Sequence, residues 1–152
     1  MPYPVSYTHL SFYELGVSEY KGSVDAFLNA GMEHINKRYD RQYAELMRKK
    51  FVRILDTSMK IFGRFAFRRM PDFNKRRPIS KALFETWTSI LARCPFEALS
   101  ALENQKEVIM EKYRFMCESD EDFIESIGSG KVSSVKKRFE KIEGLVKEII
   151  TV

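Results

Sequence analysis

Cysteine and histidine are scarce in this chain of 152 residues, which contains two of each. Two cysteines do not make the disulfide framework of a small secreted domain, so we expect Cys94 and Cys117 to be reduced residues of the core. The two histidines, His9 and His34, have no second ligand at the spacing of a metal site. The sequence therefore predicts neither a disulfide scaffold nor a metal centre in this chain.

Long apolar runs are missing as well. No stretch approaches the roughly 18 consecutive apolar residues of a transmembrane helix, and no basic region followed by an apolar core marks a signal peptide. We therefore expect a cytoplasmic protein that has no membrane partner. A hydrophobic content of 44% and an aromatic content of 13% argue against disorder, and the length is typical of one domain.

Apolar residues recur at helical spacing along most of the chain, and no segment has the pattern of a sheet of three or more strands. Ser23 and Ser80 are suited to cap helices, and acidic residues from Asp120 onward suit a first helical turn. The expected helices cover residues 23–35, 39–62, 80–93, 104–117, 120–128 and 133 onward, with a short further helix after Pro95. The predicted fold is all-α, a compact bundle of about six helices.

The positive charge is concentrated in one segment. Between Lys60 and Lys81 there are eight basic residues and one acidic residue, a net charge of +7, whereas the rest of the chain has 18 basic and 20 acidic residues. Pro71 and Pro78 bracket the polar run DFNKRR, as in a loop. Clustered basic residues with aromatic residues nearby are the usual footprint of contact with a nucleic-acid backbone.

The candidate nucleic-acid-binding residues are basic residues of this segment: Arg64, Arg69, Lys75, Arg76, Arg77 and Lys81. Two other interpretations of the charge remain open, a solvated face and a contact with acidic groups of another domain. Gly63 is suited to end the preceding helix, and Phe65 to Phe67 would fit an extended turn that pins this end to the core. Arg68 follows Phe67, a residue expected to be buried, which favours a structural or interdomain role for Arg68.

The run IFGRFAFR, followed after a loop by ISKALFETW, resembles the C-terminal helical half of the GmrSD N-terminal-domain family. This family is bacterial and includes restriction and phage-defence proteins. The resemblance covers roughly residues 20–150, and Ser80 departs from it where asparagine is usual. The matching residues are Phe62, Gly63, Ala66, Phe67, Arg68, Lys81, Ala82, Leu83, Phe84 and Glu85.

The resemblance implies that catalysis belongs to another part of the parent protein. Members have a ParB/sulfiredoxin-like N-terminal half that uses a nucleotide and a divalent metal, and its glutamine–arginine motifs are not found in this chain. The chain is then a helical accessory domain, the C-terminal part of a larger α/β protein. It would have no cofactor of its own, and its partners would be that catalytic domain and DNA. Phe62, Gly63, Phe67, Arg68, Lys81, Leu83, Phe84 and Glu85 would have structural or interdomain roles.

The N-terminal run VSYTHL, at residues 5–10, resembles a translated sequencing adapter. Residues 1–10 are therefore expected to be an artefact or an extended arm, and residues 11–152 the helical domain. The alternative to the accessory domain is a free-standing helical interaction or regulatory module without enzymatic activity. Such a module would associate with itself or with another protein.

Overall fold

The computed structural model describes residues 5–151, which form eight α-helices and two 3₁₀ turns, with no β-strand among them. The α-helices are α1 (Val5–Leu15), α2 (Val24–Arg38), α3 (Arg41–Phe62), α4 (Lys81–Ala92), α5 (Phe96–Asn104), α6 (Lys106–Ser119), α7 (Glu121–Ile127) and α8 (Val132–Ile150). The 3₁₀ turns are η1 (Val17–Glu19) and η2 (Gly63–Phe65). The all-α prediction is confirmed. Seven of these helices, including the short one after Pro95, were expected, and α1 was not.

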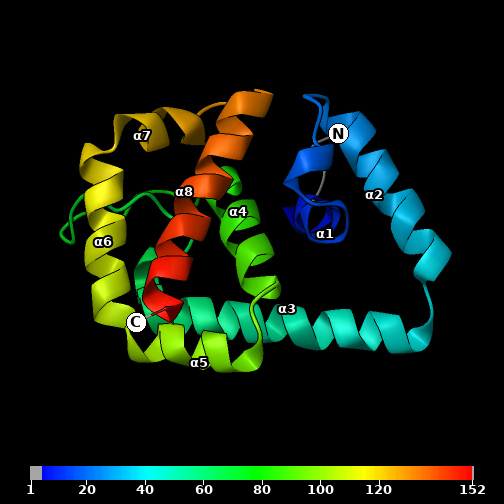
Figure 1. Ribbon diagram of the computed structural model, residues 1–152, viewed down its shortest axis with the longest axis horizontal. Coiled ribbons are helices and arrows are strands. Elements are labelled where there is room, and N and C mark those ends of the chain that lie inside the picture. Colours follow the sequence, from blue (N-terminus) through cyan, green and yellow to red (C-terminus); the bar gives the residue numbers. More distant parts are fainter. Residues whose placement is uncertain (1–4, 152) are drawn as a thin grey trace.

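Helix α4 is the centre of the fold. It packs against α1, α3 and α8, while α3 runs along one edge of the molecule (Figure 1). Nine of its 12 residues are buried, so both its apolar and its polar faces are enclosed. The hydroxyl groups of Thr86, Thr88 and Ser89 donate to carbonyl groups one turn earlier in the same helix. These polar side chains are therefore satisfied without solvent.

Side-chain caps start four of the helices. Ser23 Oγ accepts from the Ala26 N–H at the start of α2, and Ser80 Oγ accepts from the Leu83 N–H at the start of α4. Asp120 caps α7 in the same way, and Asp40 caps α3. Each such cap contributes about 1 kcal/mol of helix stability. The predicted caps at Ser23 and Ser80 are confirmed. Cys117 lies in the core as expected, and Cys94 is half-buried against it.

Helix α1 crosses the boundary that the sequence places at residue 10, although residues 1–4 lie outside the described part of the chain. Residues 5–10 are helical rather than an extended arm. The side chains of His9 and Ser11 are buried, and burial lowers the pKa of His9 to about 4. Gly31 of α2 allows α1 and α2 to cross closely, because a Cβ at this position would overlap the side chain of Ser11 on α1. A glycine inside this helix has a packing role.

The segment after α3 also corrects an expectation. Residues 63–65 form the 3₁₀ turn η2 instead of an extended turn. Phe65, the last residue of η2, and Ala66 after it are buried. Phe67 has a φ of 60°, and it is the only residue other than glycine with positive φ in the described part of the chain. The chain therefore reverses sharply here, and its backbone is strained at Phe67.

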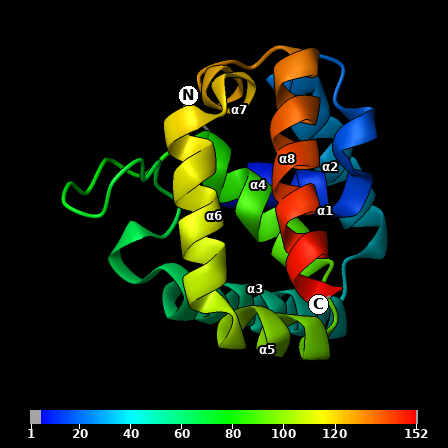
Figure 2. The ribbon, with the colours of Figure 1, turned by 60° about the vertical axis from the view of Figure 1, so that its left-hand side comes forward.

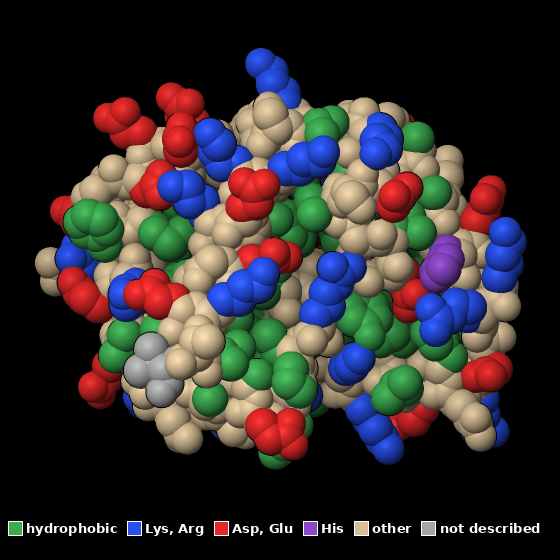
Figure 3. Space-filling view, in the orientation of Figure 1, with side chains coloured by type: hydrophobic (Ala, Val, Ile, Leu, Met, Phe, Trp, Pro, Cys, Tyr) green, Lys and Arg blue, Asp and Glu red, His purple; other side chains and the backbone are tan. Residues whose placement is uncertain are grey.

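None of the described helices has the combination of length and apolar composition that crossing a lipid bilayer requires. The exposed surface agrees with this observation, since acidic and basic side chains are intermingled over the face shown in Figure 3.

The end of α3 at Gly63 leads to a prediction about stability. Gly63 has a φ of 52°, and a Cβ at this position would meet no atom within 4 Å. Gly63→Ala should therefore lower the free energy of unfolding by about 1 kcal/mol or more through backbone strain alone. Gly144, on the exposed face of α8, also has open space around it. Gly144→Ala should stabilise the protein by roughly 0.5–1 kcal/mol.

Urea unfolding of the two variants measures both effects. Equal stability changes at the two glycines would contradict the conformation assigned to Gly63.

Candidate nucleic-acid interface

The basic loop, residues 71–78, projects from the body of the molecule between η2 and α4 (Figure 2). Its tip has a defined turn, since Asp72 Oδ1 accepts the backbone N–H groups of Asn74 and Lys75, both at 2.9 Å. This arrangement is a typical turn nucleated by aspartate. Lys75 and Arg76 follow the turn and are exposed. The loop that the two prolines predict is therefore present, with these two cations at its tip.

Hydrogen bonds close the base of the basic loop. Arg68 and Ile79 form an isolated antiparallel bridge, and the Ser80 N–H donates to the Phe67 carbonyl at 2.9 Å. The Arg68 guanidinium donates to the Arg77 carbonyl at 2.5 Å. The Tyr113 hydroxyl on α6 donates to the Arg68 carbonyl at 3.1 Å. Arg68 thus joins the two ends of the loop to each other and to α6.

Aromatic rings and arginines pack beneath the loop. The rings of Phe65 and Phe73 lie 6.0 Å apart, and the Arg64 guanidinium lies 5.0 Å from the Phe65 ring centroid. Arg114 of α6 contacts the other side, 6.0 Å from the Phe73 ring, and donates to the Pro71 carbonyl at 3.5 Å. Phe73 itself is 42% exposed. The aromatic residues within the basic segment therefore support the loop, and part of Phe73 faces solvent.

The cations of this segment after Lys60 have no acidic partners among the described residues, whereas Lys60 itself pairs with Asp56 and Glu103. Among the described residues, no carboxylate lies within 4.0 Å of the cationic nitrogens of Arg64, Arg69, Lys75, Arg76, Arg77 or Lys81. Elsewhere, cations on several helices are paired, as Lys112 is with Glu148 and Lys141 with Asp120. The one acidic side chain of the segment, Asp72, is used by the turn. The field of these cations is therefore uncompensated locally.

The six candidate residues differ in their position and in their exposure to solvent. Lys75 and Arg76 form the tip, and Arg64 lies at the base of the loop with an exposed side chain. Arg69 and Arg77 are half-buried, and Arg69 Nε donates to the Cys117 carbonyl at 3.2 Å. Lys81 is exposed at the start of α4, beside a cavity. Lys75 and Arg76 are thus the residues best placed to meet an extended polyanion.

Residues of the motif that resembles the GmrSD family join α3 to α4. Phe62 packs edge-on against Trp87, with ring centroids 4.9 Å apart, and Phe67 packs against Phe84 at 4.8 Å. Leu83 is fully buried in the same core. The contacts of these residues position the first turn of α4 relative to the loop.

Glu85, the last residue of this motif, takes part in a buried ion pair. Arg138 Nη2 on α8 donates to Glu85 Oε1 at 3.2 Å, and both side chains are at most 10% exposed. Arg138 also donates to Thr86 Oγ1 and to the carbonyl groups of Ser126 and Ser129. Burial raises the pKa of Glu85 and lowers the pKa of Arg138, because desolvation disfavours both charged forms. The attraction between the two groups opposes these shifts.

Sequence patterns did not single out Arg138. The signal that could have found it is its position, since it lies in the apolar stripe of α8 between Val135 and Ile142. A basic residue at an inward position needs a buried partner. Its partner lies 53 residues away in the chain, so helical spacing does not reveal it.

The buried pair leads to a second prediction. Arg138→Met leaves the Glu85 carboxylate buried without its cation, so it should lower the free energy of unfolding by about 3–5 kcal/mol. Glu85→Gln added to Arg138→Met removes the charge and should recover part of the loss. The exposed pair of Lys112 and Glu148 serves as the control, and Lys112→Met should cost less than about 1 kcal/mol.

Urea denaturation of the three variants measures these differences. A cost of Arg138→Met no greater than that of Lys112→Met would show that the buried pair does not hold the fold.

Comparisons with known proteins add no relative to this picture. No protein-family model, curated protein or solved structure matches the chain. In the part of the chain that the structure describes, no three His, Cys, Asp or Glu side chains are grouped so that they could share a metal ion.

Proposed function

We propose that this chain is a helical accessory domain that contacts a nucleic-acid backbone through the basic loop. One observation carries the proposal: the loop projects from the helices and presents Lys75 and Arg76, whose cationic nitrogens have no carboxylate within 4.0 Å among the described residues. Basic side chains that neutralise phosphates release condensed counterions, and this release drives binding that does not depend on sequence. An exposed pair of unpaired cations is suited to that role.

The closed base of the loop favours the same function. Ordering a flexible loop upon binding costs conformational entropy. Here the Arg68–Arg77 and Phe67–Ser80 hydrogen bonds and the Asp72 turn hold the loop before any ligand arrives. Lys75 and Arg76 are therefore presented at a fixed place, and less entropy is lost when they meet phosphates.

The resemblance of residues 62–85 to the GmrSD N-terminal-domain family supports a wider setting for this contact. In that setting the chain belongs to a nucleotide-dependent restriction or phage-defence protein of the cytoplasm. It packs on a ParB-like catalytic domain, which would hold the nucleotide and the divalent metal. The basic loop then helps that protein to hold DNA while catalysis takes place in the other domain.

The third prediction tests the basic loop directly. Lys75→Ala combined with Arg76→Ala should weaken binding to duplex DNA by a similar factor for unrelated sequences, because phosphate contacts read no base. The slope of log affinity against log salt should become less steep by about 1.8, at roughly 0.9 for each phosphate that is no longer neutralised. Fluorescence anisotropy over a range of salt concentrations measures this slope.

A matched control uses two exposed lysines outside the segment, Lys106 and Lys136, which have no ion pair among the described residues. Lys106→Ala with Lys136→Ala removes the same charge and should leave the slope unchanged. Neither double variant should change stability by more than about 0.5 kcal/mol, since exposed charges contribute little. If both double variants reduce the slope equally, the net charge and not the loop governs binding.

A second candidate function, a module that assembles with other copies of itself, is favoured by the surface of α3. Val52 and Met59, which are seven residues apart and so lie on one face of this helix, are 54% and 56% exposed. Large exposed apolar side chains that share a face are typical of contact surfaces. The two functions are compatible, because the basic loop and the exposed side chains of α3 are different parts of the surface.

The fourth prediction concerns this assembly. If α3 is the contact surface, the weight-average mass should rise with protein concentration, and Val52→Gln combined with Met59→Gln should abolish the rise. Val108→Gln on α6, where the side chain is 42% exposed, is the control and should have no effect. Sedimentation equilibrium measures the mass. A mass equal to that of one chain at all concentrations would exclude self-assembly through α3.

A further inference from the structure

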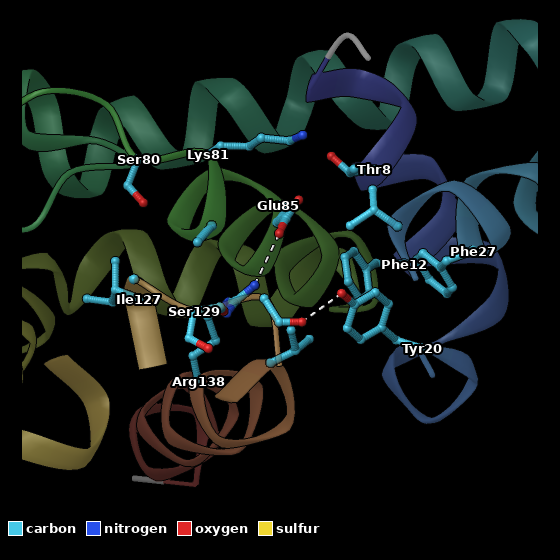
Figure 4. A pocket seen from close by; sticks show the side chains of 15 residues that line it. Thr8, Phe12, Tyr20, Phe27, Ser80, Lys81, Glu85, Ile127, Ser129 and Arg138 are labelled. Atoms are coloured by element: carbon cyan, nitrogen blue, oxygen red, sulfur yellow. Dashed lines mark hydrogen bonds and ion pairs between the residues drawn. The ribbon is translucent and has the colours of Figure 1, made fainter. Parts of the chain in front are cut away.

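A cavity opens beside the first turn of α4, behind the end of the basic loop (Figure 4). Its volume is about 350 Å³, and its walls come from α1, α2, α4, α8 and the connection between α7 and α8. Pockets for small molecules usually have volumes of about 300–1,000 Å³ and mainly apolar walls with a few placed polar groups. This cavity has that size, and its lining combines both kinds of side chain.

One wall of the cavity is aromatic. Phe12 lies 4.7 Å from Phe27 and 6.0 Å from Tyr20, measured between ring centroids. The Tyr20 hydroxyl donates to the Gly130 carbonyl at 2.7 Å, so this ring is fixed in place across the cavity. The three rings are only 3–4% exposed, so they close the back of the cavity and present their edges to a ligand, while Val24 lies at its rim with 41% of its surface exposed.

The polar part of the lining is the buried pair of Glu85 and Arg138. The guanidinium donates four hydrogen bonds to Thr86, Ser126, Ser129 and Glu85. It is therefore largely occupied by the protein. The Glu85 carboxylate has two oxygens with about four acceptor sites, of which Arg138 takes one on Oε1.

Another hydrogen bond to the Glu85 carboxylate comes from Thr8, and this bond lowers the pKa of Glu85. With Arg138 and Thr8 as its protein donors, the carboxylate still has acceptor capacity for a donor inside the cavity.

Lys81 supplies a cation at the same cavity. It lies one helical turn before Glu85 on α4, and its charge lowers the pKa of that carboxyl group. Its side chain is exposed and extends above the cavity (Figure 4). Since Arg138 offsets Glu85, Lys81 leaves the lining with one net positive charge. A ligand with an anionic group is therefore favoured.

We infer that this cavity binds a small planar aromatic molecule that carries a carboxylate and a ring N–H or O–H donor. The ring lies against Val24 at the rim and meets the edges of Phe12 and Tyr20. Its donor bonds to Glu85, and the carboxylate pairs with Lys81. This binding is distinct from nucleic-acid contact, since the aromatic wall and the basic loop are separate surfaces. Lys81 alone belongs to both sets of residues.

Indole-3-acetate is a suitable probe, because it has a ring N–H and a carboxylate on a planar ring. Titration of the ¹⁵N-labelled chain, followed by NMR, should give saturable shifts at residues of the cavity lining. 1-Naphthylacetate has no ring donor and should bind at least about tenfold more weakly, as for loss of a hydrogen bond to a charged group. Indole has no carboxylate and should bind about two- to fivefold more weakly.

Two variants, each with a matched control, test the location of the probe. Val24→Trp fills the rim and should abolish the shifts, while Val108→Trp, the same change at an equally exposed valine of α6, should preserve them. Lys81→Gln should weaken indole-3-acetate by about two- to fivefold and leave indole unchanged, because only the carboxylate meets Lys81. Lys106→Gln is its charge-matched control and should change neither. Amide spectra of each variant report whether the fold is retained.

Three results would overturn the inference: no saturable shifts with indole-3-acetate at millimolar concentration, equal binding by Val24→Trp, or equal loss from Lys106→Gln. The outcome is separable from that of the basic loop. Lys75→Ala with Arg76→Ala should leave binding of the probe intact, and Val24→Trp should leave the salt dependence of DNA binding intact.

Discussion

A single buried guanidinium joins the parts of the chain that place both proposed sites. Arg138 connects α8 to α4 through Glu85 and Thr86, and to the end of α7 and the connection after it through the carbonyls of Ser126 and Ser129. A charge held away from water is tolerated only where it is paired and hydrogen-bonded. The first turns of α4 are therefore fixed relative to α8, and so is Ser80, the cap of α4 that follows the basic loop.

The loop depends on this arrangement in a direct way. Its far end is held by the Ser80 N–H and by the Arg77 carbonyl, and its near end by Phe67 and Arg68. The strained backbone at Phe67 is compensated by contacts of that residue with Phe84 on α4. A fixed helix start, a closed base and a turn at Asp72 together present the two cations of the tip. The same helix start forms one side of the cavity.

Much of the helical structure could be predicted from the sequence because its signals are local. Ser23 and Ser80 cap helices through groups three residues away, and Gly63 ends α3 within its own turn. The pairing of Glu85 with Arg138 could not be predicted in this way, since it joins residues 53 positions apart. Helix α1 was not predicted, because the resemblance of residues 5–10 to a translated adapter led us to expect an artefact or an extended arm there. In the structure these residues are helical, and His9 is buried against Phe51.

Local sequence signals also fail to predict which of the candidate nucleic-acid-binding residues are exposed. Composition identified the basic segment and the prolines identified the loop, but exposure within it depends on tertiary contacts. Arg69 reaches the Cys117 carbonyl on α6, and Arg77 is half-buried with its carbonyl bound to Arg68. Neither contact has a sequence pattern. Lys75 and Arg76 remain at the tip because the hydrogen bonds at the base draw their neighbours inward.

The central claim is that nucleic acid meets this protein at the tip of the basic loop. Lysine acetylation, read out by mass spectrometry with and without duplex DNA at low salt, tests it on the unmodified chain. The account predicts that DNA protects Lys75 from acetylation and leaves the exposed Lys106 and Lys136 reactive. Equal reactivity of Lys75 with and without DNA, or protection confined to Lys106 and Lys136, would contradict it.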